Sequence, residues 1–329
     1  MAAVLGLDIG GANLKAAHVN GHALSVPFAL WKDPALLPHA LRTLIGQMPA
    51  ADVWAVTTTG ELCDCFESKR QGVHVILDAV KEAAGNTPVH VWRNDGCFVD
   101  VAVARETALQ VAAANWLALA TFAGPYATWG ASLLIDVGST TTDIVPLLDG
   151  RPIPQERTDP QRLRCHELVY TGVRRTPLCA LLGGAGAAEL FATTLDVYLV
   201  LECLQARPSD RSTADGRPGT KPHAHARLAR MLCADLESST EAERLELAER
   251  VVSRQIELIQ AAVTEVAARL PTTPLTVLFA GEGEFLAERA VRSLPSLSTS
   301  RKVLLSVKLG PEISQAACAY AVAMLAAKE

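Results

Sequence analysis

Two short segments of this chain combine the residue types that bind phosphate groups. In each, an apolar run ends in an aspartate, and a turn rich in glycine or hydroxyl residues follows directly. The first segment carries Asp8 and Lys15, and the second carries Asp136. Glycines let backbone N–H groups approach phosphate oxygen atoms, while a carboxylate can hold Mg²⁺ that also binds the phosphate. A lysine would bring a positive charge to the same oxygen atoms.

A third glycine-containing turn follows the apolar run at residues 275–280. One such turn alone also fits a tight hairpin with a buried aspartate, but three together predict a phosphate-binding site. The residues expected to bind phosphate are Gly10, Gly11, Asn13, Gly138, Ser139, Thr140, Thr141, Gly281 and Gly283. We expect Asp8 and Asp136 to hold Mg²⁺ and to act in catalysis together with Lys15.

Further candidates follow a strand predicted at residues 53–57. Thr59, Gly60 and Glu61 should lie at the carboxyl end of that strand, where ligands bind in α/β sheets. Lys69 and Arg70 stand close to the start of the next predicted helix. They could reach a substrate phosphate or carboxylate, or they could form a solvated first turn.

A turn in the second half of the chain adds a second set of candidates. The residues there that we expect to contact substrate are Tyr170, Thr171, Arg174 and Arg175. Arginine in such a turn can clamp a carboxylate through two parallel hydrogen bonds. Glu167, just before the turn, and Glu61 are the candidates for a general base, and each could instead cap a helix or form an ion pair.

The composition excludes several classes of protein. The chain has 329 residues, enough for about two domains, and 50% of them are hydrophobic. A net charge of −5 and an aromatic content of 5% argue against a nucleic-acid partner. Asp8 interrupts the apolar N-terminus, which argues against a signal peptide, so we expect a cytoplasmic protein. A homodimer stays open.

The cysteines could suggest a metal or redox site, and one long uncharged stretch could suggest a membrane span, but neighbouring residues argue against both. The eight cysteines form no C-x-x-C pair, and we expect free thiols in a reducing compartment. Cys63 and Cys65 are the only close pair, and the sequence assigns them no role. Residues 107–135 are uncharged, but Asn115 and Pro125 interrupt them. We therefore expect a buried helix, a turn and a buried strand there, with no membrane span.

The elements that must position these residues repeat in the two halves of the chain. Each half begins with a strand, a polar turn, a second strand and a tight turn, at 20–21 and at 149–150. Strands are expected at 2–7, 23–30, 53–57, 89–92, within 133–147 and at 275–280, and helices at 34–47, 66–84, 106–123, 241–270 and 313–327.

The three turns resemble those of the actin, sugar-kinase and Hsp70 superfamily. Residues 8–15 and 136–143 are similar to its two phosphate loops, and 279–283 to its adenosine loop. The resemblance implies an α/β fold of two actin-like (ribonuclease-H-like) lobes, with mixed sheets flanked by helices and a cleft between the lobes. We expect the lobes at 1–130 and 131–329, with the last helix placed to pack back on the first. Glu282 interrupts the glycines of the third loop, so ATP stays open as a ligand.

A closer resemblance covers nearly the whole chain. Residues 56–62, 64–70, 111–116, 167–177, 213–218 and 227–231 resemble hydantoinase/oxoprolinase-like proteins of the tetrahydromethanopterin-linked one-carbon pathway. The resemblance implies a transferase of methanofuran or methylofuran biosynthesis. Such an enzyme joins an aminomethylfuran-methyl diphosphate to the phenol of a tyramine- or tyrosine-derived acceptor, and diphosphate leaves.

Two other functions remain open at this point. One is an ATP-dependent kinase or a hydantoinase/oxoprolinase-type amide hydrolase, which would need an intact adenosine loop. The other is a nucleotide-switched regulatory protein without turnover of a small substrate. Fold alone does not choose among them, because this superfamily supports many activities.

Overall fold

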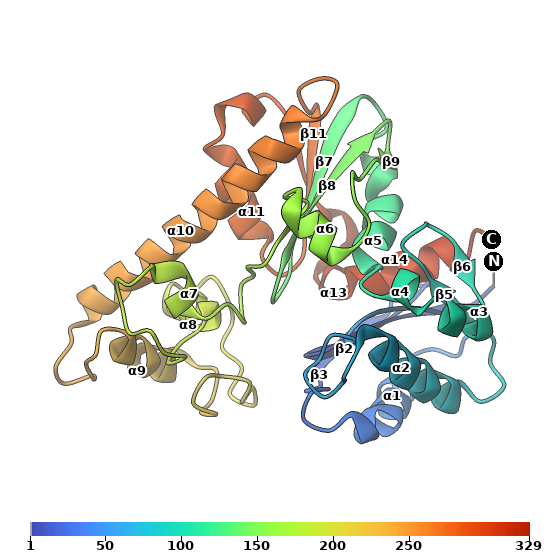
Figure 1. The fold of residues 1–329 in the computed structure, drawn as a ribbon, viewed down its shortest axis with the longest axis horizontal. Helices are drawn as coiled ribbons and strands as arrows, with labels where there is room; N and C mark the ends of the chain where they lie inside the picture. The colour runs from blue at the N-terminus through green and yellow to red at the C-terminus, as the bar shows by residue number, and fades with distance from the viewer. Residues whose placement is uncertain (1) are drawn as a thin grey trace.

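The computed structural model describes residues 2–329, and its first β-sheet lies in the N-terminal part of the chain (Figure 1). The strand order is β3-β2-β1-β4-β5-β6. Its strands are β1 (Val4–Gly10), β2 (Asn13–His18), β3 (Ala23–Pro27), β4 (Val53–Thr59), β5 (Val89–Trp92) and β6 (Phe98–Val99). β1 pairs antiparallel with β2 and parallel with β4, so the sheet is mixed.

The second sheet repeats this plan in the C-terminal part. The strand order is β10-β8-β7-β11-β12, with β9 paired to β8. Its strands are β7 (Ala131–Val137), β8 (Thr142–Leu148), β9 (Arg151–Pro152), β10 (Leu168–Val169), β11 (Thr276–Ala280) and β12 (Arg301–Leu304). β7 pairs antiparallel with β8 and parallel with β11, as β1 does with β2 and β4. The expected two-lobed actin-like α/β fold is confirmed.

The helices of the N-terminal part are η1 (Pro34–Leu36), α1 (Leu37–Ile45), α2 (Lys69–Ala84), α3 (Val101–Glu106), α4 (Ala108–Val111), α5 (Asn115–Ala123) and η2 (Gly124–Tyr126). The helices up to α4 flank the first sheet, whereas α5 packs mainly against the last helix of the chain and against strands of the second sheet. Ser68 caps α2 by accepting a hydrogen bond from the Gln71 N–H. The single helix expected at 106–123 is wrong, because Ala112 leaves the helix to pair with Thr58 and Ala113 has a positive φ of 49°.

The helices of the C-terminal part include the longest in the molecule. They are α6 (Asp159–Arg164), α7 (Leu178–Leu182), α8 (Thr194–Val200), α9 (Lys221–Met231), α10 (Glu241–Ala268), α11 (Glu284–Arg292), η3 (Pro295–Leu297), α12 (Leu305–Leu309), α13 (Pro311–Gln315) and α14 (Ala317–Ala326). Thr240 and Glu243 form a capping box at the start of α10. The helix α10 runs from the second sheet to the group formed by α7, α8 and α9 (Figure 1).

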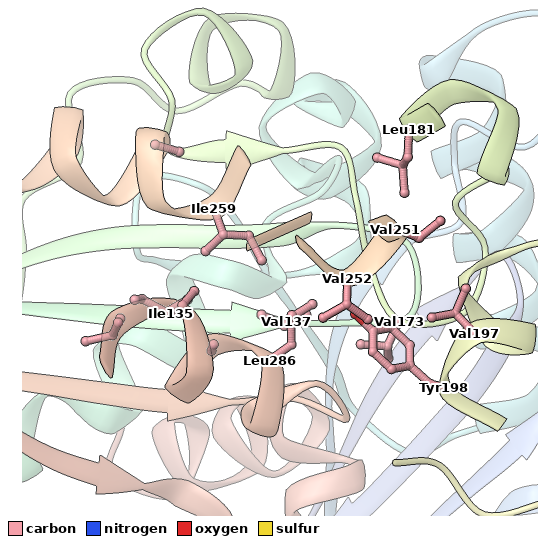
Figure 2. Packing of buried hydrophobic residues seen from close by; sticks show 14 of the residues in the cluster. Ile135, Val137, Val173, Leu181, Val197, Tyr198, Val251, Val252, Ile259 and Leu286 are labelled. Atoms are coloured by element: carbon pink, nitrogen blue, oxygen red, sulfur yellow. The ribbon is translucent and has the colours of Figure 1, made fainter. Parts of the chain in front are cut away.

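The largest hydrophobic core lies between the second sheet and these helices. Figure 2 shows Val137 of β7 beside Val252 of α10 and Leu286 of α11, with Ile135 further along the same strand in the same cluster. These side chains are at most 1% exposed. Their burial fixes β7, and with it the end of the strand at which Asp136 stands.

A second core joins the two halves of the chain. It contains buried residues of β1, β4, β7 and β11 together with α5 and α14. α14 contacts β1 so closely that a Cβ at Gly6 would overlap the Ala319 carbonyl oxygen. The last helix therefore packs against the first sheet. The helix expected at 313–327 is divided at Ala316, between α13 and α14.

Two expectations about the chain as a whole can be compared with the structure. All eight cysteines are free thiols. The uncharged stretch forms α4, α5, η2 and the first part of β7, so a turn and a buried strand follow as expected, but two helices stand where one was expected. In the described part of the chain, no helix combines the length and the apolar character needed to cross a bilayer.

Candidate active site

The first aspartate and its lysine stand opposite each other on the β1–β2 hairpin. Asp8 and Lys15 are directly paired in the register of the two strands. The Lys15 Nζ lies 3.4 Å from Asp8 Oδ2. Asp8 is 3% exposed, and its other oxygen, Oδ1, has no hydrogen-bond partner among residues 2–329. A buried carboxylate oxygen without a partner is what a ligand or a metal ion would satisfy.

The second aspartate faces another carboxylate across the β7–β8 hairpin. Asp136 is paired in register with Asp143. Asp143 is neutralised by Arg162, whose Nη1 lies 2.7 Å from its Oδ1. Burial and the charges of Asp143 and Asp8 raise the pKa of Asp136 to about 7, although Lys15 opposes them. Asp136 is thus a carboxylate that lacks a cation of its own within its hairpin.

The two hairpins meet at Lys15. Burial alone would lower the pKa of Lys15, but the nearby charges of Asp8, Cys318 and Asp136 raise it above its ordinary value. Asp8 and Asp136 therefore lie close enough for both to act on one ammonium group. Cys318 of α14 lies among them, and burial together with the two carboxylates raises its pKa well above the usual range. The structure thus brings the predicted carboxylates and lysine together.

The two turns after Asp8 and Asp136 leave backbone N–H groups free. Among residues 2–329, the N–H groups of Gly11, Ser139 and Thr140 have no hydrogen-bond acceptor. The Gly138 N–H is used within its own turn, since it donates to the Thr141 carbonyl oxygen at 2.9 Å. Free N–H groups in two facing turns can bind an anion.

Several of these turn residues serve packing as well. A Cβ at Gly11 would lie 2.7 Å from the Cys63 Sγ, and one at Gly10 would lie 3.0 Å from the Asn13 carbonyl oxygen. A Cβ at Gly172 would lie 2.6 Å from the Thr140 N, so the 170–176 segment lies directly against the second turn. Glycine is therefore required there for close approach of two backbones.

Thr171 is part of a buried polar network. Its hydroxyl accepts a hydrogen bond from the Gln255 Nε2 at 2.7 Å, and Gln255 in turn accepts one from the Tyr198 hydroxyl at 2.7 Å. The Thr142 hydroxyl donates to the Thr171 carbonyl oxygen at 2.8 Å. Thr171 is 1% exposed. Thr171 therefore holds the second turn in place, and our expectation that it contacts substrate stays a prediction.

The two arginines of this segment have different partners. Arg174 donates to both carboxylate oxygens of Glu282, at 2.5 and 2.6 Å, and lies 3.3 Å from Asp210 Oδ2. Despite burial, Arg174 holds the pKa of Glu282 below its ordinary value. Arg175 instead stacks over the ring of Trp31, with its Cζ 4.6 Å from the ring centroid. Only Arg175 therefore keeps its guanidinium available for a ligand.

The third turn packs against the second. Gly281 has a φ of +85°, and a Cβ there would overlap the Asp136 Oδ1. The Gly283 N–H donates to the Val137 carbonyl oxygen at 2.9 Å. The Gly283 N–H is therefore already used within the fold, and phosphate binding at Gly283 stays a prediction. Gly281 is needed so that the third turn can approach Asp136.

The strand-end candidates of the first half gather beside the first turn. A Cβ at Gly60 would lie 3.3 Å from the Gly10 C, and Thr59 pairs with Gly10 in the β1–β4 register. Glu61 is 2% exposed, and its Oε2 has no partner in the described chain. Burial raises the pKa of Glu61 to about 7, although Lys69 opposes this effect.

The remaining candidates are exposed or already form an ion pair. The Lys69 Nζ lies 3.3 Å from Asp159 Oδ2, so Lys69 joins the two halves of the chain. Arg70 is exposed. Tyr170 is 62% exposed. These placements leave the expectations for Arg70 and Tyr170 as predictions.

Glu167 has the contacts of a structural residue, and its role as a base stays a prediction. It is fully buried, and its carboxylate accepts a hydrogen bond from the Gln155 N–H at 2.8 Å. The same oxygen lies 3.1 Å from the Arg269 Nη2. A buried carboxylate held by a backbone N–H and an arginine is typical of an ion pair that stabilises the fold.

Sequence reasoning missed several residues of the site. Trp31 and Cys318 stand in ordinary apolar runs, and Arg162 follows no motif. Cys63 could have been noticed as one of the close pair, and it lies against Gly11. Burial and Cys65 raise the pKa of Cys63 to about 11, although Arg175 opposes them.

Comparison with known proteins assigns the chain to a family. The hydantoinase/oxoprolinase family model matches residues 52–329. A (4-{4-[2-(gamma-L-glutamylamino)ethyl]phenoxymethyl}furan-2-yl)methanamine synthase from Methanocaldococcus jannaschii is 32% identical over 99% of this chain and 98% of its own length. A protein of the same name from Methanococcus vannielii is 30% identical over 60% of this chain and 91% of its own length.

Among solved structures, an acetone carboxylase in its nucleotide-free form is similar in fold. The TM-score is 0.56 at 10% identity, over 98% of this chain and 70% of that chain. At this identity the likeness concerns the fold alone. The family model covers most of the chain and the first relative nearly all of it, and the chain therefore belongs to the hydantoinase/oxoprolinase family.

Proposed function

We propose that this enzyme is a synthase that forms an ether bond between the oxygen of a phenol and a furanylmethyl carbon. The names of both archaeal relatives describe a product in which a phenoxymethyl group is attached to a furan that carries an aminomethyl group. The bond that unites the two aromatic halves of that product is the C–O bond of the ether. The expected acceptor is a tyramine- or tyrosine-derived phenol.

The observation that carries the proposal is that Lys15, which is paired with Asp8, also acts electrostatically on Asp136 of the other hairpin. Two turns with free N–H groups flank these three residues. Such a site suits a diphosphate leaving group, whose negative charge increases as its bond to carbon breaks. The electron pair of that bond stays with the diphosphate, and the phenol oxygen forms the new bond to carbon and loses its proton.

The donor set also suits Mg²⁺. Asp8 Oδ1 is buried without a partner, and Asp136 is a second oxygen donor nearby. Among residues 2–329 no group of three or more His, Cys, Asp or Glu side chains could hold a metal ion. Mg²⁺ held by Asp8 and Asp136 would draw its other ligands from phosphate oxygens and water. When bound there it would supply charge stabilisation for the leaving diphosphate.

Glu61 is the better candidate for the base that accepts the phenol proton. Unlike Glu167, it has a carboxylate oxygen without a partner, and it directly follows Gly60, which packs against Gly10 of the first turn. A pKa of about 7 suits proton transfer at neutral pH. The role of Glu61 in substrate binding, together with Thr59 and Gly60, belongs to the same proposal.

An assay of diphosphate release tests the function. Purified protein with Mg²⁺ should release diphosphate from an aminomethylfuran-methyl diphosphate when a phenolic acceptor is present, and not without it. γ-Glutamyltyramine, tyramine and tyrosine should be compared as acceptors. ATP should be tested in parallel, because the acetone carboxylase that shares the fold is described as ATP-dependent. ATP hydrolysis without diphosphate release would reject the synthase in favour of a kinase or an amide hydrolase.

A matched pair of variants supports the assay. Asp8→Asn removes a charge beside Lys15, whereas Asp33→Asn removes one from an exposed residue that forms no capping hydrogen bond. Loss of turnover in the first variant with full turnover in the second is expected. Equal rates in both would contradict the role of the first hairpin.

A further inference from the structure

We propose that Trp31 and Arg175 form the acceptor subsite, in which the indole binds the phenol ring and the guanidinium binds a carboxylate of the acceptor. This inference rests on the proposed function. It adds a residue, Trp31, that the motifs did not indicate. It also gives the two neighbouring arginines different roles, with Arg174 in an ion pair and Arg175 in ligand binding.

The pair stands where the two phosphate turns meet. Trp31 follows Leu30, whose N–H donates to the Gly11 carbonyl oxygen at 2.9 Å. The Arg175 N–H donates to the Ser139 carbonyl oxygen at 3.0 Å. Each partner is therefore fixed to a different turn, and the stack of Arg175 on Trp31 joins the two halves of the chain beside the anion site.

Arg175 is close enough to the first turn to act on Cys63, which packs against Gly11. Its positive charge lowers the pKa of Cys63, although burial and Cys65 have larger effects in the opposite direction. The Cys63 Sγ in turn lies 2.7 Å from the position that a Cβ of Gly11 would take. A ligand held at Arg175 would thus lie next to a diphosphate held at Gly11 and Ser139, which is where an attacking phenol must be.

Both groups are available to a ligand. Arg175 is exposed, and no carboxylate of residues 2–329 forms an ion pair with it. Arg174, its neighbour, is committed to Glu282 and Asp210. Trp31 is partly exposed. The structure therefore leaves the Arg175 guanidinium without a carboxylate partner, stacked on an indole that is itself partly exposed.

The chemistry of these groups matches the acceptor half of the relatives' product. That half contains a phenoxy ring and a γ-glutamyl group, which carries a carboxylate. An aromatic ring stacks on an indole, and a guanidinium binds a carboxylate through two parallel hydrogen bonds. On binding, the phenol ring takes the place of the guanidinium on Trp31, and Arg175 turns to the carboxylate.

Equilibrium binding by calorimetry tests the subsite with two ligands, γ-glutamyltyramine and tyramine, which lacks the carboxylate. Arg175→Ala should weaken γ-glutamyltyramine binding at least tenfold and leave tyramine binding within twofold. Trp31→Ala should weaken both ligands at least fivefold, and Trp31→Phe should retain most of the affinity because a ring remains. Lys32→Ala, an exposed neighbour of Trp31, should bind both ligands as the wild type does.

The outcomes separate this inference from the proposed function. The binding experiment needs no diphosphate substrate, so the expected selectivity without any turnover would support the subsite and reject the synthase. Turnover by the wild type, with Arg175→Ala affecting both ligands equally or neither, would overturn the subsite and keep the synthase. If the pair only held the two halves together, Arg175→Ala would lower thermal stability without changing the preference between ligands, which would also overturn the inference.

Discussion

The two hairpins that carry Asp8 and Asp136 share a backbone plan but differ in the residue opposite the aspartate. In the first, the partner in register is Lys15, and the pair is neutral within one hairpin. In the second, the partner is Asp143, and the compensating cation comes from Arg162 in α6. The same backbone arrangement therefore carries a balanced ion pair in the first hairpin and two facing carboxylates in the second.

The difference accounts for the distribution of charge at the site. Arg162 is bound to Asp143 and leaves Asp136 without a cation in its own hairpin, so burial raises the pKa of Asp136 to about 7. Lys15 of the first hairpin is the cation that acts on Asp136. The charge of Asp136 in the second hairpin is thus balanced by Lys15 of the first. A ligand that binds between the hairpins would interact with charged groups of both.

The largest effect is expected from removing the cation of the second hairpin. Arg162→Met would leave Asp143 buried and unpaired, and Arg162 also stacks on Trp116 at 3.8 Å. Breaking one partner of a buried pair costs about 3–5 kcal/mol of unfolding free energy. Urea unfolding measures this loss. The double variant with Asp143→Asn should recover much of it, and a double variant as unstable as the single one would contradict the pairing.

The next effect concerns the cation of the first hairpin. Lys15→Met should reduce turnover by about 10²–10³-fold, since it removes the positive charge nearest the leaving diphosphate and leaves two carboxylates facing it. Steady-state rates of diphosphate release measure this change. Lys15→Arg keeps the charge and should retain more activity than Lys15→Met. Equal rates in the two variants would show that the charge is not used.

Glu61 extends the comparison to a buried carboxylate with an unpartnered oxygen. Its pKa of about 7 in the folded protein exceeds the unfolded value of 4.5. The unfolded state therefore loses its proton first as the pH rises, and stability falls between about pH 4.5 and 7. Glu61→Gln cannot ionise and should be more stable than the wild type at pH 8 by ~2–3 kcal/mol, with little difference at pH 4.5.

Unfolding curves at the two pH values measure the effect of Glu61. Glu67→Gln is a matched control, because Glu67 is exposed and lies on the same segment. The control should follow the wild type at both values. A parallel shift of both variants would mean that the burial of Glu61 does not govern the pH dependence.

The sequence was sufficient for the parts of the fold that local pattern determines. The alternation of apolar runs and tight turns predicted both hairpins, and β5 was expected at the residues where it lies. It was not sufficient for β10 and β12, which are short edge strands at residues 168–169 and 301–304. Such strands pair because the sheet beside them is already formed, and their own pattern is too short to show this.

Site residues could be predicted from the sequence only where the reactive side chains lie within the same short motif that forms the turn. Asp8, Lys15 and Asp136 stand in the hairpins themselves, so their types and spacing indicated them. Glu167 and Glu61 could not be distinguished, because whether a carboxylate meets an arginine depends on residues about 100 positions away, such as Arg269. The same holds for Trp31, whose partner Arg175 comes from the other half of the chain.

The smallest predicted effect is also the direct test of the shared site. Asp8→Asn and Asp136→Asn should each reduce turnover at least tenfold, or about 1.4 kcal/mol of barrier, because each removes one oxygen donor for Mg²⁺. Rates of diphosphate release across a Mg²⁺ titration measure this, and both variants should need more Mg²⁺ for half-maximal rate. If the two aspartates act on one ligand, the double variant should lose less than the product of the two single losses, since contacting residues are not independent. Losses that multiply would mean that the hairpins act at separate places, and the proposed division of labour between them would be wrong.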